Sequence, residues 1–354
     1  MRRERDSNPR YIAVRWFSRP VHSTTLPSLQ KWSAKIKIFS IHKNFIKFNY
    51  RFIIYQFLNF AYLYIFNLIK VIHKFIYFLF WLISSLSFSI LYFTLYPVFL
   101  IFNYIFRYRE NIVNNNIKNA LTLLNDKDKK EVAKRFYLYF FNLLIEICKM
   151  ASVDKAFYLN RIKVINPELL EKYRLQNKSI ILMMGHHNNW EWASQIISII
   201  AKQDFIGIYK KLSNKFFDKL MLKIRSRFGV ILVEMEDSIH YIFNNKNCKI
   251  IGLASDQNPI VNSKTYWTNF FNQAVPCFIG AEKIARKMDY PVLFCNMTKE
   301  ANGYYVIKFE IIEDNPQNSK YGDITNKFIK RLEEKIIEEP NSYLWSHNRW
   351  KHKK

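Results

Sequence analysis

Two long uncharged apolar stretches in the first third of the chain limit what it can fold into. They are FIIYQFLNFAYLYIFNLI at 52–69 and FIYFLFWLISSLSFSILYFTLYPVFLIFNYIF at 75–106. A helix needs roughly 20 such residues to cross the hydrocarbon layer of a membrane. Because the second stretch exceeds one span and contains Pro97, we predict one spanning or re-entrant helix followed by a second helix along the interface. A buried core hairpin is the alternative.

Basic residues flank this apolar region, with Lys43, Lys47 and Arg51 before it and Arg107 and Arg109 after it. By the positive-inside rule, such flanks favour a cytoplasmic location for the bulk of the chain. There is no signal-peptide cleavage pattern, so we expect the apolar segment to remain as an anchor.

The first thirty residues differ in composition from the rest of the chain. Residues 1–30 contain six arginines, no lysine and three of the ten prolines. We expect this segment to be disordered and interpret it as upstream sequence from a mis-assigned start; a basic membrane-surface arm is the alternative. The chain then divides into a basic tail at 1–51, membrane-anchoring helices at 52–106 and a cytoplasmic domain at 107–354.

The net charge of +26 predicts anionic partners. Nucleic acid, anionic lipid headgroups and an acidic protein all qualify. The sequence has no zinc-knuckle or helix-turn-helix signature, and nucleic-acid binders rarely carry such an anchor, so we favour lipid and expect no nucleic acid. The four cysteines form no C-x-x-C pair, which is typical of reduced thiols in a cytosolic domain.

After a helical region at 108–151, strand-like and helix-like segments alternate from residue 179 onward. The strand candidates are SIILMMG, DFIGIYK, GVILVE, CKIIGLAS, YPVLFCNM and GYYVIKFEII, and the helix candidates include NKFFDKLMLKIRSRF and GAEKIARKM. This alternation predicts an α/β fold, a membrane-anchored mixed sheet covered by helices. Functional residues of such sheets lie beyond the carboxyl ends of the strands, where His186 and Asp256 fall.

The stretch MMGHHNNWEWA at 183–193 concentrates polar residues directly after an apolar strand candidate. In one interpretation His186 is a general base and Glu191 orients it, fixing its tautomer and stabilising the imidazolium. In a second, His187 and Glu191 ligate a metal, although zinc usually needs a third protein ligand and no H-E-x-x-H motif or second Cys/His cluster supplies one. In a third, the histidines are core or capping groups and the tryptophans pack. The residues alone leave these three open.

The same stretch resembles the H-x4-D/E motif of the glycerolipid acyltransferases and, in its longer form, the signature of the lipid A biosynthesis lauroyl/myristoyl acyltransferases. Further blocks extend the resemblance from about residue 70 to the end of the sequence. They are YRENIVNNNIKNAL, YKKLSNKFFDKLMLKIRSRFG, ASDQNP, FIGAEKIARKMDYPVLFCN and YLWSHNRWK. Asn188 stands where the family usually has glycine, and Asn348 stands where it often has arginine. Asparagine tolerates a left-handed backbone, so we expect the turn at 188 to form.

The resemblance implies transfer of a fatty acyl chain from an acyl carrier protein thioester to a hydroxyl of a lipid A precursor, without a cofactor or metal. It implies a location at the cytoplasmic face of the bacterial inner membrane. His186 would be the base and Glu191 its partner. Asp256 and Arg225 match further family positions, with a strand-end turn and a solvated helix face as their structural alternatives. Another membrane-lipid acceptor, a metal-dependent membrane hydrolase and a non-catalytic membrane protein are the competing functions.

Two further groups are candidates for binding substrates. The asparagine at 348 stands where an arginine could contact phosphate, and Arg349 and His347 remain available for that contact. Lys210 and Lys211 follow a strand candidate, and we expect them to form part of a docking surface for the acidic carrier protein. A plain solvated charge pair is the alternative for the two lysines.

Overall fold

The structure is a computed structural model that describes residues 44–105 and 107–352. It divides into two compact units, one of Met1–Leu79 with Leu212–Leu220 and one of Phe80–Lys211 with Met221–Lys354. The segment at 1–30, and with it most of the tail predicted at 1–51, lies outside the described residues. The described part of that tail, residues 44–51, is helical.

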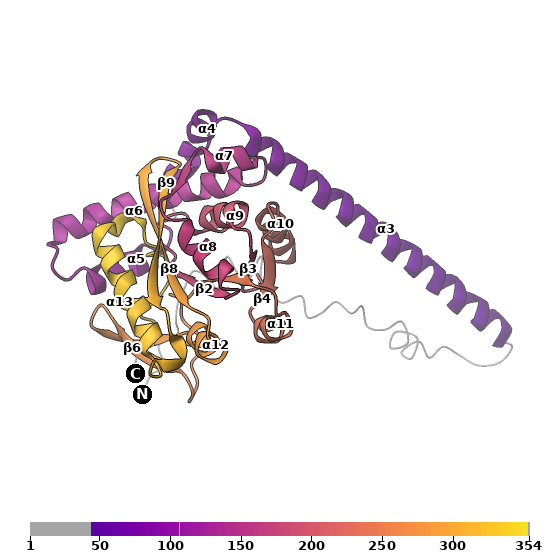
Figure 1. Cartoon of the computed structure of the whole chain (residues 1–354). Helices are drawn as coiled ribbons and strands as arrows, with labels where there is room; N and C mark the ends of the chain where they lie inside the picture. The colour runs from indigo at the N-terminus through magenta and orange to yellow at the C-terminus, as the bar shows by residue number, and fades with distance from the viewer. Residues whose placement is uncertain (1–43, 106, 353–354) are drawn as a thin grey trace, which may run out of the picture. The chain divides into compact units, whose positions relative to one another are not determined.

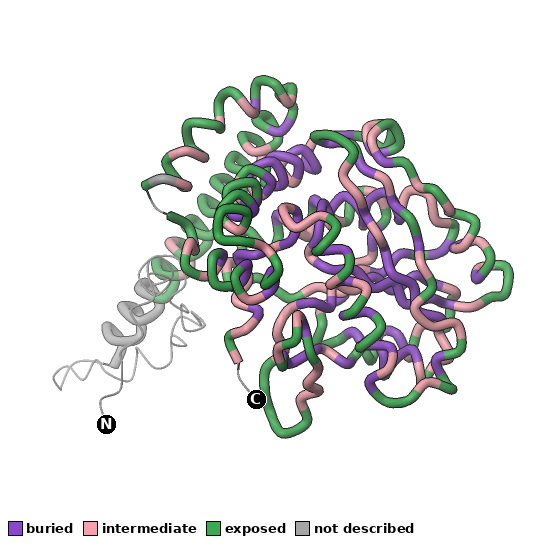
Figure 2. Tube along the Cα trace, turned by 90° about the vertical axis from the view of Figure 1, so that its left-hand side faces the viewer, coloured by how far each residue is buried: buried purple, intermediate pink, exposed green. Residues whose placement is uncertain are grey.

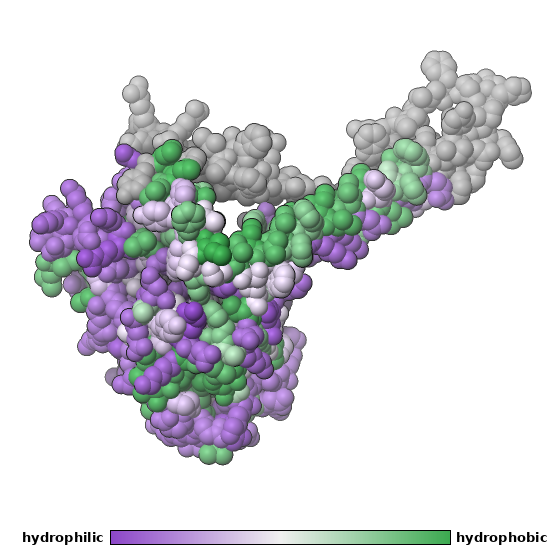
Figure 3. Space-filling view, turned by 90° about the horizontal axis from the view of Figure 1, so that it is seen from above, coloured by the Kyte–Doolittle hydropathy of each residue, from purple (hydrophilic) through white to green (hydrophobic). Residues whose placement is uncertain are grey.

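Helix α3 (Asn44–Ser85) supplies most of the described residues of the first unit. Its described side chains are mainly apolar and exposed, and hydrophobic residues follow one another along it in Figure 3. Among the described residues, one helix, Tyr55–Ser85, is long and apolar enough to cross a membrane, and the most apolar part of it has no buried residue. By its length and composition, α3 is therefore a candidate membrane anchor.

The sequence predicted two helices within 75–106, and the first of these is in fact the end of α3, which also covers the stretch at 52–69. The second helix begins after a serine and not at the proline. Helix α3 ends at Ser85, and Ser87 caps helix α4 (Phe88–Leu100) by accepting a hydrogen bond from Ile90 N at 3.3 Å. Pro97 lies inside α4, and a π-helical turn, η1 (Ile101–Ile105), follows it. A serine side chain that replaces a missing backbone partner is a common helix start. Proline removes one backbone bond and crowds the preceding turn, and here α4 continues past Pro97 for three residues before the π-helical turn begins.

The second unit is built around a mixed sheet of seven described strands in the order β1-β9-β8-β2-β5-β3-β4. Neighbouring strands are parallel except for the antiparallel pair β8 and β9. Two further strands, β6 and β7, form a separate antiparallel hairpin. The mixed α/β fold predicted from the sequence is confirmed, and Figure 1 shows helices on both sides of the sheet.

The strands are β1 (Ile162–Val164), β2 (Ile180–Met184), β3 (Asp204–Tyr209), β4 (Ile231–Glu234), β5 (Lys249–Ala254), β6 (Tyr266–Phe270), β7 (Gln273–Cys277), β8 (Val292–Ala301) and β9 (Tyr304–Glu313). The remaining α-helices are α5 (Glu110–Ala120), α6 (Asp126–Lys149), α7 (Lys155–Leu159), α8 (Glu168–Leu175), α9 (Trp190–Ile200), α10 (Lys215–Arg225), α11 (Ser238–Asn244), α12 (Gly280–Met288) and α13 (Asp323–Glu338). Two short 3-10 helices, η2 (Pro316–Asn318) and η3 (Pro340–Ser342), flank α13.

The central strand β2 is buried at all five positions, and Figure 2 shows buried residues concentrated along the strands. A parallel strand covered on both faces needs such a continuous apolar run. Ile181 and Met183 face the main core, which contains residues of α5, α6, α12 and α13. The alternate residues of β2 point to the opposite face. This core fixes the end of β2, from which the polar motif extends.

Candidate active site

His186 lies two residues beyond the carboxyl end of β2, in the turn that leads into α9. Asn189 caps α9, because its Oδ1 accepts a hydrogen bond from Trp192 N at 2.9 Å. Asn188 has a φ of 54°, so the asparagine adopts the left-handed backbone conformation that was expected at this position. The turn reverses the chain sharply and leaves the His186 side chain at the edge of the sheet, 16% exposed.

Asp256 holds one side of the His186 ring. It lies beyond the carboxyl end of β5, which pairs in parallel with β2, so the two loops meet at the same edge of the sheet. Asp256 Oδ1 is 2.6 Å from His186 Nδ1 and also accepts a hydrogen bond from His186 N at 3.1 Å. The Asp256 side chain is only 2% exposed. One buried carboxylate therefore fixes both the imidazole ring and the backbone of His186.

The electrostatics of this pair favour the charged forms of both groups. Burial alone would lower the pKa of His186, but the charge of Asp256 and its hydrogen bond outweigh burial and raise that pKa above its ordinary value. Burial alone would raise the pKa of Asp256, but His186 lowers it to about 2. Asp256 thus strengthens His186 as a base and stabilises the imidazolium that forms when it takes a proton.

The other ring nitrogen of His186 faces the residue that follows Asp256. Gln257 Nε2 lies 3.2 Å from His186 Nε2. Trp190 packs edge-on against the imidazole, with ring centroids 4.9 Å apart. Two consecutive residues of the β5 loop therefore contact the two nitrogens of one ring.

Glu191 bonds to Arg225 with both carboxylate oxygens. Arg225 Nε donates to Glu191 Oε2 at 2.8 Å, and Arg225 Nη2 donates to Oε1. Glu191 was expected from the sequence to orient His186, but in the structure the carboxylate at Nδ1 belongs to Asp256. The reason is local: Glu191 is in the first turn of α9, next to the last residue of α10, whereas Asp256 extends from the neighbouring strand.

The residues of this site lie in a part of the chain that matches one family of known proteins. The family model of the bacterial lipid A biosynthesis acyltransferases matches residues 65–352. The chain belongs to this family. No curated protein matches it significantly. Membership supports an acyltransferase activity on lipid A, with a lipid A acceptor and an acyl donor, and the His186–Asp256 pair lies within the matched region.

In this acyltransferase, Arg349 supports the loop that carries Asp256. Its side chain is 1% exposed, and its guanidinium bonds to Asn258 Oδ1, to Pro276 O at 2.8 Å and to Cys277 Sγ at 3.1 Å. Asn258 also donates to Asn348 O at 2.8 Å. Two residues of the C-terminal signature, Asn348 and Arg349, therefore bond to Asn258, the residue that follows Gln257.

The candidate docking lysines lie on the same edge of the sheet. Lys210 directly follows β3, which runs parallel to β5, and its side chain is exposed. Lys211 is exposed as well, and its Nζ is 2.7 Å from Glu234 Oε1. Both lysines are accessible to a partner that approaches this edge.

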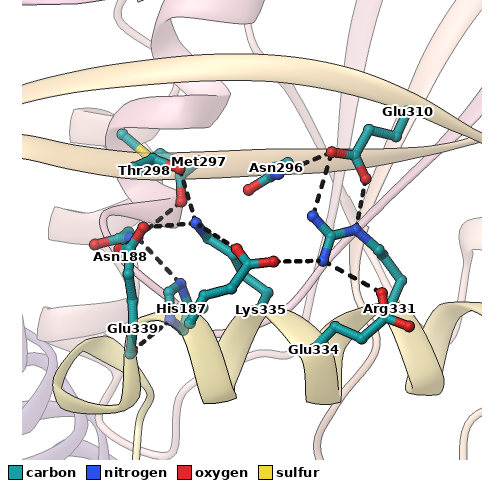
Figure 4. Close-up of polar contacts among 11 residues, drawn as sticks. His187, Asn188, Asn296, Met297, Thr298, Glu310, Arg331, Glu334, Lys335 and Glu339 are labelled. Atoms are coloured by element: carbon teal, nitrogen blue, oxygen red, sulfur yellow. Dashed lines mark hydrogen bonds and ion pairs between the residues drawn. The ribbon is translucent and has the colours of Figure 1, made fainter.

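A polar cluster behind the motif fixes the turn to α13 (Figure 4). Asn188 Nδ2 donates to Met297 O at 2.7 Å and to Glu339 Oε2 at 2.8 Å, and His187 Nε2 is 3.0 Å from Glu339 O. Lys335 Nζ donates to Glu339 Oε1 at 2.6 Å. Burial lowers the pKa of His187 to about 4, so this ring is neutral. The metal interpretation required His187 and Glu191 as ligands. In the structure His187 contacts Glu339 and Glu191 bonds to Arg225.

A second buried group, Glu146 of α6, anchors the same turn and was not predicted from the sequence. Its Oε2 accepts hydrogen bonds from Asn189 Nδ2 at 2.6 Å and from Tyr305 Oη at 2.7 Å. Trp192 Nε1 donates to the backbone oxygen of Glu146 at 3.0 Å. Burial raises the pKa of Glu146. The available signal was a lone carboxylate within the apolar run FFNLLIEICKM, because a buried acid needs specific partners.

Proposed function

We propose that this acyltransferase moves a fatty acyl chain from an acyl carrier protein thioester to a hydroxyl of a lipid A precursor at the cytoplasmic face of the inner membrane. The observation that carries the catalytic part of the proposal is the buried Asp256 bonded to His186 Nδ1 at 2.6 Å. This bond leaves Nε2 as the nitrogen that can accept a proton. An imidazole oriented in this way by a carboxylate is a general base.

In the proposed reaction, His186 Nε2 removes the proton from the acceptor hydroxyl while its oxygen attacks the thioester carbonyl carbon. Asp256 stabilises the resulting imidazolium. When the tetrahedral intermediate collapses, the carbon–sulfur bond breaks, and the imidazolium returns the proton to the leaving thiolate. The products are an ester and a free thiol, and His186 is neutral again. General-base catalysis of this kind typically contributes about 10²- to 10⁴-fold to the rate.

The pair of Glu191 and Arg225 has a separate role in this proposal. Its two hydrogen bonds lock the start of α9 to the end of α10, two elements that flank the reacting histidine. Glu191 also adds negative charge that raises the pKa of His186, and Arg225 opposes it. We assign Glu191 to the positioning of the motif and Arg225 to substrate binding at the edge of the sheet.

The membrane part of the proposal rests on α3 and α4. The exposed apolar surface of Tyr55–Ser85 is compatible with a membrane span. Helix α4 has 13 residues, too few to span, and suits a place along the interface. A membrane location would bring the site to its lipid acceptor, and basic residues after the apolar region favour a cytoplasmic orientation.

The test of this function is mass spectrometry of lipid A from cells that carry or lack the gene. Wild-type protein should add one acyl chain, and His186→Ala should abolish the addition while the protein still accumulates in membranes. His240→Ala is the matched control, because His240 is exposed on α11. Full activity of His186→Ala would exclude the general base, and an acylated lipid other than lipid A would replace the proposed acceptor.

A further inference from the structure

The side chain of Gln257 lies against Nε2 of His186, the nitrogen that acts as the base in the proposed reaction. With Nδ1–H donated to Asp256, the neutral His186 ring has one lone pair, on Nε2, directed outward in the ring plane. The amide nitrogen of Gln257 lies 3.2 Å from Nε2, and in the neutral form of the ring it is placed to donate a hydrogen bond to that lone pair. A hydroxyl that gives its proton to Nε2 must first take the position of this amide.

The loop geometry explains why the amide is directed there. Gln257 follows Asp256, whose carboxylate accepts both the ring and the backbone hydrogen bond of His186. Asn258, the next residue, is held by Arg349 and by Asn348 O. Gln257 is therefore fixed on both sides by bonded neighbours. Its own side chain is partly exposed, so solvent and a substrate can reach it.

From this arrangement we infer that Gln257 is a positioning residue that caps the base until the acceptor displaces it. The inference rests on the proposed function, because it assigns a further residue to the same reaction. Water competes with the acceptor for the thioester: with its proton taken by His186, water would form a carbon–oxygen bond, the carbon–sulfur bond would break, and the thiolate would receive the proton. The products would be a fatty acid and a thiol. A capped Nε2 does not bind and activate this water.

The acceptor differs from water in how it can remove the cap. A lipid hydroxyl is delivered by the binding of the whole lipid, and that binding energy offsets the loss of one weak hydrogen bond. A single water molecule gains only the hydrogen bond that it replaces. The cap therefore favours transfer over hydrolysis without slowing transfer greatly.

The first test measures how the acyl group is divided between the two products. Purified full-length protein in detergent receives an acyl thioester that supports transfer, with and without a lipid A precursor, and fatty acid and acylated lipid are both quantified. Gln257→Ala leaves space for water at Nε2. It should raise the ratio of hydrolysis to transfer by about 3- to 10-fold, the range produced by the loss of one neutral hydrogen bond. Gln317→Ala, a change at an exposed glutamine in η2, should keep the wild-type ratio.

The second test uses Gln257→Glu, which keeps the size of the side chain. A carboxylate at this position accepts from a protonated Nε2 and stabilises the imidazolium, so the pH at half-maximal transfer should rise. This midpoint tests whether the side chain at 257 lies against Nε2, and the ratio of hydrolysis to transfer in Gln257→Ala tests whether it acts as a cap. The inference is overturned if Gln257→Ala lowers both products in proportion, or if Gln257→Glu leaves the midpoint unchanged. These results differ from a failure of the proposed function, in which wild-type protein would acylate no lipid A precursor.

Discussion

The hydrogen bond between His186 and Asp256 makes a direct prediction about pH. Because the pKa of His186 is raised, a larger share of the ring is protonated near neutral pH, and the transfer rate should rise with pH until the ring is neutral. In Asp256→Asn the raising charge is lost and burial remains, so the pKa of His186 should fall. The midpoint of the pH–rate profile should then move to lower pH, while the plateau rate drops about 10²- to 10⁴-fold.

The measurement is a pH–rate profile of wild type and Asp256→Asn at saturating substrate. Asp289→Asn is a control change of an aspartate that forms a partly exposed ion pair with Lys178. A midpoint that stays in place in Asp256→Asn would show that Asp256 does not set the pKa of the base.

The buried carboxylate of Glu146 supports a prediction about stability. Glu146→Ala leaves the Asn189 amide and the Tyr305 hydroxyl without their acceptor, and should lower the free energy of unfolding by roughly 2–5 kcal/mol. Glu146→Gln keeps one acceptor oxygen in place and should cost less than about 1.5 kcal/mol. Glu236→Ala, at an exposed position, is the control. Denaturant unfolding in detergent provides the comparison, and equal losses in the alanine and glutamine variants would contradict the proposed role of the acceptor oxygen.

At this scale the sequence predicted His186 as the base, but it did not predict which side chains contact the ring. His186 was predicted from a compact local motif that follows a strand candidate. Asp256 was predicted to bind substrate, but its bond to His186 was not predicted, because it joins residues 70 positions apart and depends on β2 and β5 being neighbours. Glu191 was the nearer carboxylate in the sequence, and spacing alone could not show that Arg225 would bind it. Arg349 was expected at the substrate, but its burial assigns it to the support of the loop.

Among the structural elements, α13 packs tightly against the glycine that precedes the base. A Cβ atom added to Gly185 would lie 2.5 Å from Leu332 Cδ1, in a side chain that is fully buried. Gly185→Ala should therefore lower the free energy of unfolding by about 1–3 kcal/mol, as overpacking of cores usually does. A double change with Leu332→Ala should cost clearly less than the sum of the two single changes.

Gly280→Ala is the matched control for this prediction. Gly280 begins α12 and has open space where its Cβ would lie, so alanine there should be neutral or stabilising. Thermal unfolding measures the change in the free energy of unfolding for the two single variants, for their double variant and for this control. Strict additivity of Gly185→Ala and Leu332→Ala would mean that the two residues do not interact.

The long elements were predictable from sequence, and the short ones were not. Each of the six strand candidates overlaps one of the strands β2, β3, β4, β5, β8 and β9, because their apolar runs are uninterrupted or alternate regularly. Strands β8 and β9 extend past their candidates, to Ala301 and Glu313. Strand β1 has only three residues, and the hairpin of β6 and β7 contains a proline at 276, so neither carries a strong pattern. The break at Ser87 also escaped prediction, because a capping serine within an apolar run is a weaker signal than Pro97.

For the molecule as a whole, the net charge of +26 predicts strong salt dependence with an acidic donor. Long-range attraction raises the rate of encounter, and salt screens it over about 8 Å at physiological ionic strength. Turnover with acyl carrier protein thioesters should exceed turnover with coenzyme A thioesters and fall steeply as salt rises. A preference for coenzyme A thioesters at every salt concentration would contradict the carrier protein as donor.

Reversing Lys210 and Lys211 to glutamate localises this effect. Because both lysines are exposed near the edge of the sheet that bears His186, the double variant should raise the Michaelis constant for the carrier-bound donor and spare a small thioester. Lys264→Glu with Lys283→Glu is a control of equal charge change at other exposed positions. If both donors are affected equally, the two lysines serve the acceptor or the fold.

The dependence of the Asp256 loop on Arg349 also matters while the protein is being made. The ribosome releases His186 long before Asp256, and the arginine that holds Asn258 emerges later still. Domains generally fold from the N-terminus during synthesis, but contacts between distant residues form only when both partners are present. In a nascent chain the contact between Arg349 and Asn258 therefore forms only after residue 349 has been added, and until then the loop that carries Asp256 lacks this support.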